Sequence, residues 1–197
     1  MSKTYGVVLI GCGHIGEAHI EDIYYRDNIR IVGVVDVYEP QAKLFARKYG
    51  AECYSTDYND IIHRDDVDIV IIATYARTHL AILKDCLAAG KHVLCEKPMT
   101  IRASDAEAIV AAAERNPNSK LAMMLNQRSN PLLRKIKHIV DSGELGQLRN
   151  SYYLNNNWWR PDNYYGDGWR GTWKGEGGGI LVNQAPHPQD LWIWLCG

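Results

Sequence analysis

Repeated alternation of short apolar runs with amphipathic segments is the feature that most restricts how this 197-residue chain can fold. The apolar runs occupy residues 5–10, 31–36, 68–74, 92–96 and 120–125. The run at 68–74, DIVIIAT, is continuous, as in strands that are buried on both faces of a parallel sheet. Strand and helix patterns that alternate across short connections predict right-handed crossovers and a doubly wound parallel sheet.

Single residues mark where two of the intervening helices begin and end. Pro40 suits the first position of a helix, and that helix runs to Gly50, a residue type favoured just past a helix end. Ser104 with Glu107 three residues later predicts a capping box at the start of an alanine-rich helix. Both signals agree with the alternating pattern.

The pattern changes after residue 126. An amphipathic helix is expected over residues 131–142 and a strand over residues 148–159. A loop rich in glycine and tryptophan follows, and then a helix that carries His187. All six tryptophans belong to this part of the chain, and its last residues, LWIWLCG, are apolar.

These observations predict an α/β chain with two domains. A Rossmann domain with a doubly wound parallel sheet is expected over residues 1–126. An α+β second domain, which holds substrate and oligomer contacts, is expected over residues 127–197. One helix and one or two strands bury little apolar surface alone, so this second domain is expected to be incomplete.

Charge and cysteine usage exclude several classes of function. The net charge is −1, and Lys and Arg form no run longer than two, which argues against nucleic acid as a partner. No apolar stretch approaches the ~20 residues of a membrane-spanning helix. The five cysteines are odd in number and lack metal-type spacing, so no metal site is expected. The cysteines are instead expected to be buried thiols in a reducing cytoplasm.

A glycine-rich turn joins the first apolar run to the first helix. Gly11, Gly13 and Gly16 form the pattern G-x-G-x-x-G at that junction. The first glycine permits a tight turn, the second lets the backbone approach a pyrophosphate, and the third lets helix and strand pack closely. The start of the helix attracts the phosphate charge. His14 and Ile15 lie inside the motif, with His14 expected as a spacer or edge contact.

An acidic residue at the end of the second run completes a dinucleotide-binding pattern. Asp36 lies twenty residues past Gly16, where the acid that binds ribose hydroxyls is expected. A carboxylate would repel a 2′-phosphate, and Val37 and Tyr38 follow rather than an arginine. The sequence therefore predicts NAD as the cofactor in preference to NADP.

Four further segments together resemble one family. They are CEKP at 95–98, ATYARTH at 73–79, NQRSNP at 126–131 and WRGTWKGEGGGILVNQAPHPQDLWIWL at 169–195. Their combination resembles the Gfo/Idh/MocA oxidoreductases, which include glucose–fructose oxidoreductase and inositol dehydrogenase. Members of that family are usually nearly twice this long. The resemblance therefore implies that most of a mixed-sheet C-terminal domain lies outside this sequence.

The resemblance implies roles for residues around the nicotinamide. Lys97 would bind and polarise the reacting hydroxyl beside the nicotinamide, and the bond to Pro98 is often cis or strained in the family. Glu96 would lie beside the ribose. Thr74 and His79 match positions that line the cofactor.

The resemblance also implies a base in the second domain. His187 matches the histidine that takes the substrate hydroxyl proton as hydride leaves. This chain departs from the family at Asn183, where the matched motif has Asp. An amide cannot act as a base, although it still forms hydrogen bonds to substrate. The catalytic set is thus Lys97, His187 and Asn183.

Aromatic and basic side chains cluster between residues 152 and 173. Trp169 and its aromatic neighbours offer ring faces to a sugar, or else form a packed sheet face or subunit interface. Arg160 and Arg170 would bind an acidic or hydroxylated substrate, or form salt bridges at a rim.

The favoured hypothesis is an NAD(P)-dependent oxidoreductase that moves a hydride between nicotinamide and a sugar, polyol or cyclic alcohol. Such chemistry needs a hydride acceptor, a group that stabilises the alkoxide, and a base near neutrality. The alternatives are a catalytically silent or truncated NAD-binding protein and an NAD-dependent glycosidase of the same fold. A homo-oligomer is left open.

Overall fold

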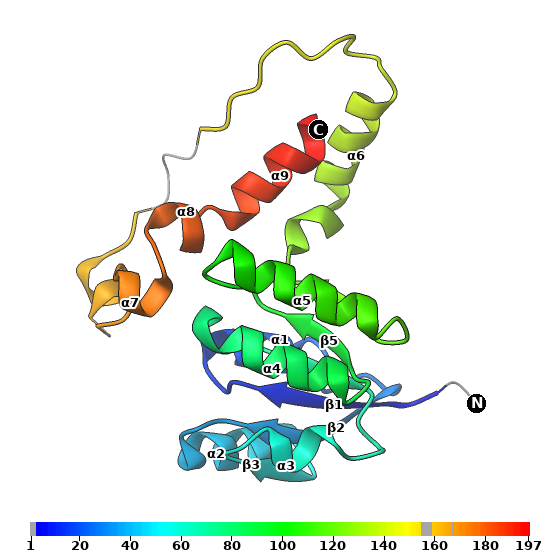
Figure 1. Cartoon of the computed structure of the whole chain (residues 1–197), viewed down its shortest axis with the longest axis vertical. Helices are drawn as coiled ribbons and strands as arrows, with labels where there is room; N and C mark the ends of the chain where they lie inside the picture. The colour runs from blue at the N-terminus through cyan, green and yellow to red at the C-terminus, as the bar shows by residue number, and fades with distance from the viewer. Residues whose placement is uncertain (1–2, 155–158, 167) are drawn as a thin grey trace. The chain divides into compact units, whose positions relative to one another are not determined.

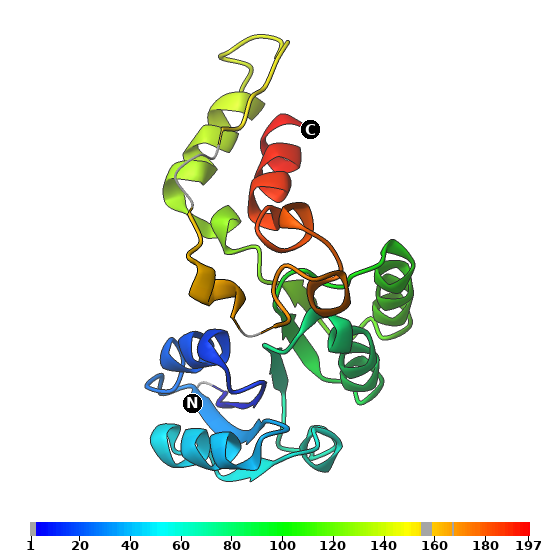
Figure 2. The same cartoon turned by 90° about the vertical axis from the view of Figure 1, so that its left-hand side faces the viewer.

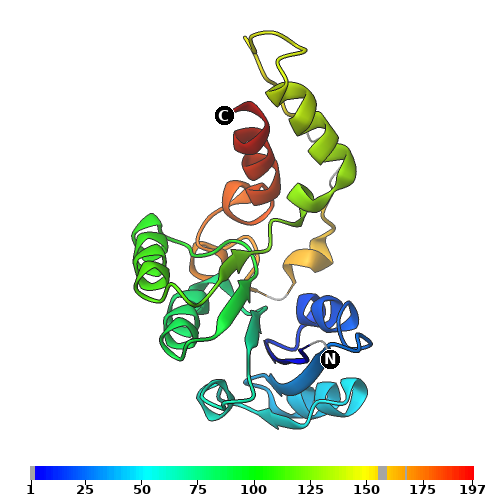
Figure 3. The same cartoon turned by 90° about the vertical axis from the view of Figure 1, so that its right-hand side faces the viewer.

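The computed structural model describes residues 3–154, 159–166 and 168–197 of the chain, which is shown from three sides in Figure 1, Figure 2 and Figure 3. The chain divides into two compact units, here called the first unit, which ends at Met123, and the second unit, Met124–Gly197. The sequence placed this boundary after residue 126. The unit boundary instead follows the last residue of a strand.

A six-stranded parallel sheet forms the centre of the first unit (Figure 1). Its strands are β1 Tyr5–Ile10, β2 Ile29–Val35, β3 Cys53–Ser55, β4 Ile69–Ile72, β5 His92–Cys95 and β6 Leu121–Met123. The order across the sheet is β3-β2-β1-β4-β5-β6, and each neighbouring pair is parallel. The direction of winding reverses between β1 and β4, as the doubly wound prediction requires. The carboxyl ends of strands at such a reversal are the usual place for a ligand.

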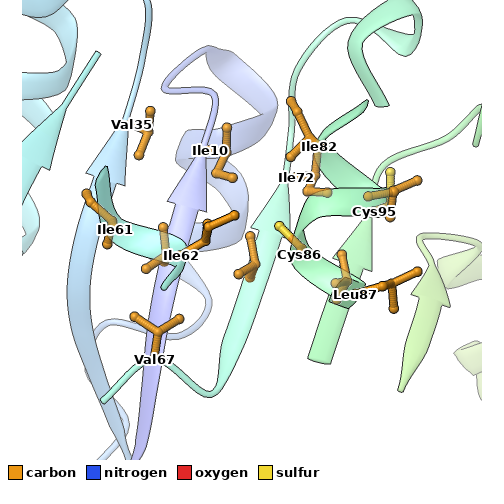
Figure 4. Packing of buried hydrophobic residues seen from close by; sticks show 14 of the residues in the cluster. Ile10, Val35, Ile61, Ile62, Val67, Ile72, Ile82, Cys86, Leu87 and Cys95 are labelled. Atoms are coloured by element: carbon orange, nitrogen blue, oxygen red, sulfur yellow. The ribbon is translucent and has the colours of Figure 1, made fainter. Parts of the chain in front are cut away.

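Helices cover both faces of this sheet. They are α1 His14–Glu21, α2 Glu39–Tyr49, α3 Asn59–Ile62, α4 Ala76–Ala88 and α5 Ala103–Arg115. Ile20 of α1 and Phe45 of α2 pack in one buried layer with Leu9 of β1. The other layer is built from α3, α4 and α5, and Figure 4 shows Ile62 and Leu87 in it.

Local signals placed most of these elements correctly and missed a few. Gly50 ends α2 in the left-handed conformation at φ 68°, as predicted, whereas Pro40 is the second residue of this helix and not the first. The capping box is wrong, because α5 begins at Ala103 after Arg102 and has no side-chain cap, which leaves Ser104 inside the helix. β3 and α3 were not predicted, because three and four residues are too short for a periodic signal.

The second unit is helical in its described residues. Its elements are η1 Asn126–Ser129, α6 Pro131–Asp141, η2 Asp162–Tyr165, α7 Trp173–Glu176, α8 Ile180–Asn183 and α9 Pro186–Cys196. The helices α6 and α9 contact each other, and η1 contacts both. The predicted start of α6 is confirmed: Pro131 opens it, and the Asn130 side chain accepts a hydrogen bond from the backbone N–H of Leu132 at 2.9 Å.

The strand predicted over residues 148–159 is wrong where the structure describes it. Residues 148–154 and Trp159 have no strand conformation, and residues 155–158 lie outside the described residues. A strand is stable only when a neighbour pairs with it, and the described part of the second unit contains no strand to serve as that neighbour. In the same described residues, no helix combines the length and apolar character needed to cross a membrane.

Candidate functional site

Two of the three motif glycines are required by packing, and one leaves space. Gly11 has φ +98°, and a Cβ there would lie 2.5 Å from the carbonyl oxygen of Ala73. A Cβ on Gly16 would lie 2.0 Å from the carbonyl oxygen of Gly11. At Gly13 a Cβ would meet no described atom within 4 Å. The turn is therefore tight at its ends and open at Gly13, as a backbone that receives a ligand must be.

The first turn of α1 faces the same opening. Gly13 is its N-cap residue and provides no side chain to accept hydrogen bonds from the helix. The first N–H groups of a helix lack partners within the helix and carry its positive end. His14 and Ile15, the first two helical residues, are exposed. This is the arrangement that suits an anionic group such as a pyrophosphate.

Asp36 is held directly against the glycine-rich turn. The backbone N–H of Cys12 donates to its Oδ2 at 2.8 Å, and that of Tyr38 donates to its Oδ1 at 2.9 Å. These bonds fix the carboxylate just past the end of β2. Gln41 of α2, which the sequence did not single out, donates from Nε2 to the carbonyl oxygen of Cys12 at 2.9 Å. One side of the turn is thus tied to both β2 and α2.

Thr74 lies just past the end of β4, and His79 lies on α4. The hydroxyl groups of Thr74 and Thr78 are 2.8 Å apart. The His79 ring is buried, with Nε2 3.1 Å from the carbonyl oxygen of Thr74 and Nδ1 3.0 Å from that of Pro98. Burial lowers the pKa of His79, against the opposing effect of these carbonyl groups. His79 therefore joins the end of β4 to the segment that follows Lys97.

Glu96 and Lys97 follow β5. The backbone N–H of Lys97 donates to Oε2 of Glu96 at 3.0 Å, and Nε2 of His19 lies 2.9 Å from Oε1. Burial alone would raise the pKa of Glu96, but the bonds from His19 and Lys97 outweigh it and hold the pKa below its ordinary value. The Lys97–Pro98 peptide is cis, as the resemblance implied. His19 was not singled out in the sequence analysis, although its helical spacing from Gly16 places both residues on the buried face of α1.

Three of the four thiols in the first unit offer no reactive group. Cys12, Cys86 and Cys95 are buried, and burial raises the pKa of each to about 12. A thiol with such a pKa is protonated near neutral pH and is a poor nucleophile. The expectation of buried thiols is wrong for Cys196, which is exposed at the end of α9, and for Cys53 of β3, which is only partly buried.

A cavity of about 480 Å³ lies within the second unit. The predicted substrate residues Arg160 and Asn183 line it, whereas Trp169, Arg170 and His187 are not among its described lining residues. Aromatic rings also line it: Tyr153, Trp159, Tyr164 and Tyr165. Aromatic faces beside polar groups suit a ligand that carries both C–H and OH groups.

The polar groups of this cavity hold one another in place. Arg160 donates from Nη2 to Oε1 of Gln184 at 2.9 Å, and Gln184 donates from Nε2 to the hydroxyl of Tyr164 at 2.7 Å. The guanidinium groups of Arg160 and Arg170 lie 4.8 and 4.7 Å from the centre of the Tyr164 ring, and Arg170 also lies 4.5 Å from that of Trp169. Both arginines are therefore stacked on aromatic rings.

Asn183 is held by a carboxylate that the sequence did not single out. Its Nδ2 donates to Oε1 of the buried Glu176, whose Oε2 accepts from the backbone N–H of Gly171 at 2.7 Å. Asn183 ends α8, and His187 lies in the first turn of α9, as predicted. A buried carboxylate therefore contacts the side chain at position 183, where the matched family motif has Asp.

Comparison with known proteins matches the whole arrangement to one family. Residues 5–124 match an oxidoreductase family with an NAD-binding Rossmann fold, and residues 133–197 match the GFO/IDH/MocA C-terminal domain. The chain is 31% identical over 195 residues to 4-carboxy-2-hydroxymuconate-6-semialdehyde dehydrogenase of Sphingobium, covering 97% of this chain and 59% of that protein. It is 30% identical over 141 residues to inositol 2-dehydrogenase of Salmonella typhimurium, covering 71% of this chain and 42% of that protein.

A solved structure agrees over the full chain. The WlbA dehydrogenase of Chromobacterium violaceum, in complex with NADH and UDP-GlcNAcA, is 31% identical with a TM-score of 0.88. The match covers 100% of this chain and 56% of that one. The chain spans about half the length of the relatives it matches. On its glycine-rich turn, its sheet order and the family matches over both units, the chain belongs to the Gfo/Idh/MocA oxidoreductase family.

Proposed function

We propose that this chain binds NAD and contributes the cofactor-binding part, and a portion of the substrate-binding part, of a dehydrogenase acting on CH–OH groups. The observation that carries the proposal is the open turn at Gly13, with Asp36 bonded to the backbone of the same turn. Relatives of this chain are named as dehydrogenases of inositol and of a muconate semialdehyde, which supports the same class of reaction here.

The residues of the turn fit a dinucleotide. Gly11, Gly13 and Gly16, with the N–H groups of His14 and Ile15, would hold the pyrophosphate, and Asp36 the adenosine ribose. The hydrogen bonds from Cys12 and Tyr38 use one lone pair on each carboxylate oxygen of Asp36, which leaves further acceptor capacity for ribose hydroxyls. A carboxylate at this place favours NAD over NADP.

The remaining residues would take part in hydride transfer. Bound NAD would accept the hydride from the carbinol carbon. Lys97 would donate a hydrogen bond to the reacting oxygen and stabilise its alkoxide, and His187 would take the hydroxyl proton, so that a carbonyl forms. Asn183 would donate or accept a hydrogen bond to substrate. Thr74, His79 and Glu96 would border the nicotinamide ribose.

A sugar, polyol or cyclic alcohol is the proposed substrate class. The cavity of about 480 Å³ has the size class of small-molecule sites, and aromatic rings and arginines belong to its walls. Arg160 lines that cavity; Arg170 and Trp169 would contact a substrate beside it. UDP-GlcNAcA, an acidic nucleotide sugar, is the ligand named for the WlbA dehydrogenase.

Titration of the purified chain with NADH, followed by fluorescence or calorimetry, tests the proposal. Gly13→Val fills the open side of the turn and is expected to weaken binding at least about tenfold. Gly50→Asn is the matched control, because Asn tolerates the left-handed conformation at the exposed end of α2. A folded chain that binds neither NADH nor NADPH would falsify the proposal.

A screen of aldoses and polyols with NAD then separates enzyme from silent binder. Turnover that Lys97→Ala reduces at least about a hundredfold supports the enzyme. NADH binding without turnover of any substrate, by this chain or by a longer one, supports the catalytically silent alternative. Asp36→Ser should narrow the preference for NAD over NADP.

Two further expectations belong with this proposal. The five free cysteines favour a reducing cytoplasm as the place of action. A homo-oligomer stays a prediction that light scattering on the purified protein can test.

A further inference from the structure

A buried side-chain pair joins the nucleotide-binding helix to the end of β5. His19 lies in the last turn of α1, and Glu96 directly follows β5, 77 residues along the chain. Nε2 of His19 and Oε1 of Glu96 are 2.9 Å apart, with side chains 8% and 15% exposed. The pair is therefore a fixed contact rather than a surface ion pair.

The same carboxylate determines the position of the next residue. While Oε1 contacts His19, Oε2 accepts the backbone N–H of Lys97 at 3.0 Å. On the other side of Lys97, the ring of His79 holds the carbonyl oxygens of Pro98 and Met99 at 3.0 and 3.2 Å. The backbone is thus held on both sides of Lys97: its own N–H by the Glu96 carboxylate, and the two following residues by the His79 ring.

We propose that His19 is a positioning residue for Lys97, acting through the Glu96 carboxylate. Packing alone does not need such a pair, because apolar residues of similar volume are often as stable as a buried ion pair. What the pair adds is direction: without His19, Glu96 loses the contact that keeps Oε2 turned toward the Lys97 amide. The inference rests on the proposed role of Lys97 in the reaction.

Exchange of the Lys97 amide proton, followed by NMR on the chain without cofactor, tests the positioning directly. His19→Leu removes the contact and is expected to speed this exchange at least about tenfold, because the amide is protected by its bond to Glu96. His19→Gln keeps an N–H donor at similar reach and is expected to restore protection. Tyr58→Phe is the control: it removes the bond of Tyr58 to Asp85 at 2.7 Å, between a loop and α4.

Turnover supplies the second readout. His19→Leu is expected to lower kcat about ten- to a hundredfold with KM for NAD changed less than about threefold, since a misplaced Lys97 affects chemistry more than nucleotide binding. His19→Gln should recover most of kcat, and Tyr58→Phe should lose stability only.

The outcomes separate this inference from the proposed function. If Lys97 amide exchange in His19→Leu equals that of the wild type, or if kcat does, the positioning role is refuted. If the wild type binds no nucleotide while the amide responds as expected, the proposed function fails and the contact through Glu96 to Lys97 stands. If His19→Leu and Tyr58→Phe lost Lys97 amide protection and kcat to the same extent, the effect would be a general one on folding, and the inference would be overturned.

Discussion

The two units of the chain differ in where they keep their apolar side chains. In the first unit, valine and isoleucine of four neighbouring strands and the inner faces of five helices form two buried layers. In the second unit, Leu191 is the one buried hydrophobic residue among those described. Leu132 of α6 is 67% exposed, and Ile193 of α9 is 68% exposed. The first unit is thus closed by its own residues and the second is not.

The contrast follows from what each kind of local sequence pattern can specify. A strand buried on both faces must be apolar along its whole length, so its sequence predicts both the strand and its burial between two layers. The sequence of an amphipathic helix specifies only that one face is covered, and it does not specify which element covers that face. The first unit is built from signals of the former kind, and the second from those of the latter.

Cysteine labelling gives the largest contrast between the units. Cys12, Cys86 and Cys95 are buried in the first unit, with the pKa of each raised to about 12, whereas Cys196 of the second is exposed. A buried thiol reacts only when the core opens, so Cys196 is expected to react with iodoacetamide at least about a thousandfold faster. Peptide mass spectrometry over time measures this. Comparable rates for all four would mean that the first unit is open.

A matched pair of core and surface truncations comes next. Ile72→Ala removes a fully buried side chain from the centre of the sheet and is expected to lower the free energy of unfolding by about 2–5 kcal/mol. Ile193→Ala removes the same atoms from an exposed place on α9, where the loss should stay below about 0.5 kcal/mol. Urea denaturation followed by circular dichroism compares them. Equal losses would show that α9 is covered in solution.

The sequence anticipated the fold where a signal was long or chemically unique. The DIVIIAT run located β4, and Pro40 with Gly50 marked α2. Prediction from the sequence failed where a segment's secondary structure depends on the element that packs or pairs with it. Residues 148–154 have a strand-like composition but no strand to pair with among the described residues of their unit. The Ser104 pattern failed because the N-cap is Arg102 and the helix begins at Ala103, which leaves the Ser104 hydroxyl inside the first turn.

The candidate site divides in the same way. Gly11, Gly13 and Asp36 were found by spacing, since motif chemistry fixes their separation along the chain. His19 and Glu176 were missed, because each acts through a residue that is distant in sequence or belongs to another element. A search of helix faces for polar residues in line with a motif glycine would have found His19.

Acid sensitivity should be a property of the first unit. Among the described residues, the carboxyl groups whose pKa values are lowered all belong to it: Glu17, Asp66, Asp68 and Glu96. A lowered pKa means that the stabilisation is complete above the ordinary value, 4.5 for Glu96, and is lost as pH falls through the folded value.

Glu96→Gln isolates one contribution to this acid sensitivity. The variant is expected to lose about 1.5–3 kcal/mol near pH 6, and the gap to the wild type should shrink steadily below pH 4.5, the ordinary value. Urea titrations across that range measure it. A gap that stays constant would show that Glu96 is not held as a carboxylate.

The smallest effect belongs to the contact that fastens α9 within the second unit. Arg128 of η1 donates from Nε to Oδ2 of Asp190 at 2.8 Å and from Nη2 to Oδ1, and its guanidinium lies 5.7 Å from the centre of the Trp194 ring. Arg128→Lys keeps the charge but loses the paired geometry, so about 0.5 kcal/mol of local stability should be lost. Amide exchange in α9 measures the loss, with Lys137→Gln, which removes an exposed pair on α6, as the control. Since Asp190 is only 11% exposed, the effect should survive 0.5 M salt, whereas the control's effect should vanish. If amide exchange in α9 were unchanged by Arg128→Lys, this helix would be held by its contact with α6 and not by the Arg128–Asp190 pair. The second unit would then resemble the first, in which apolar packing holds the helices.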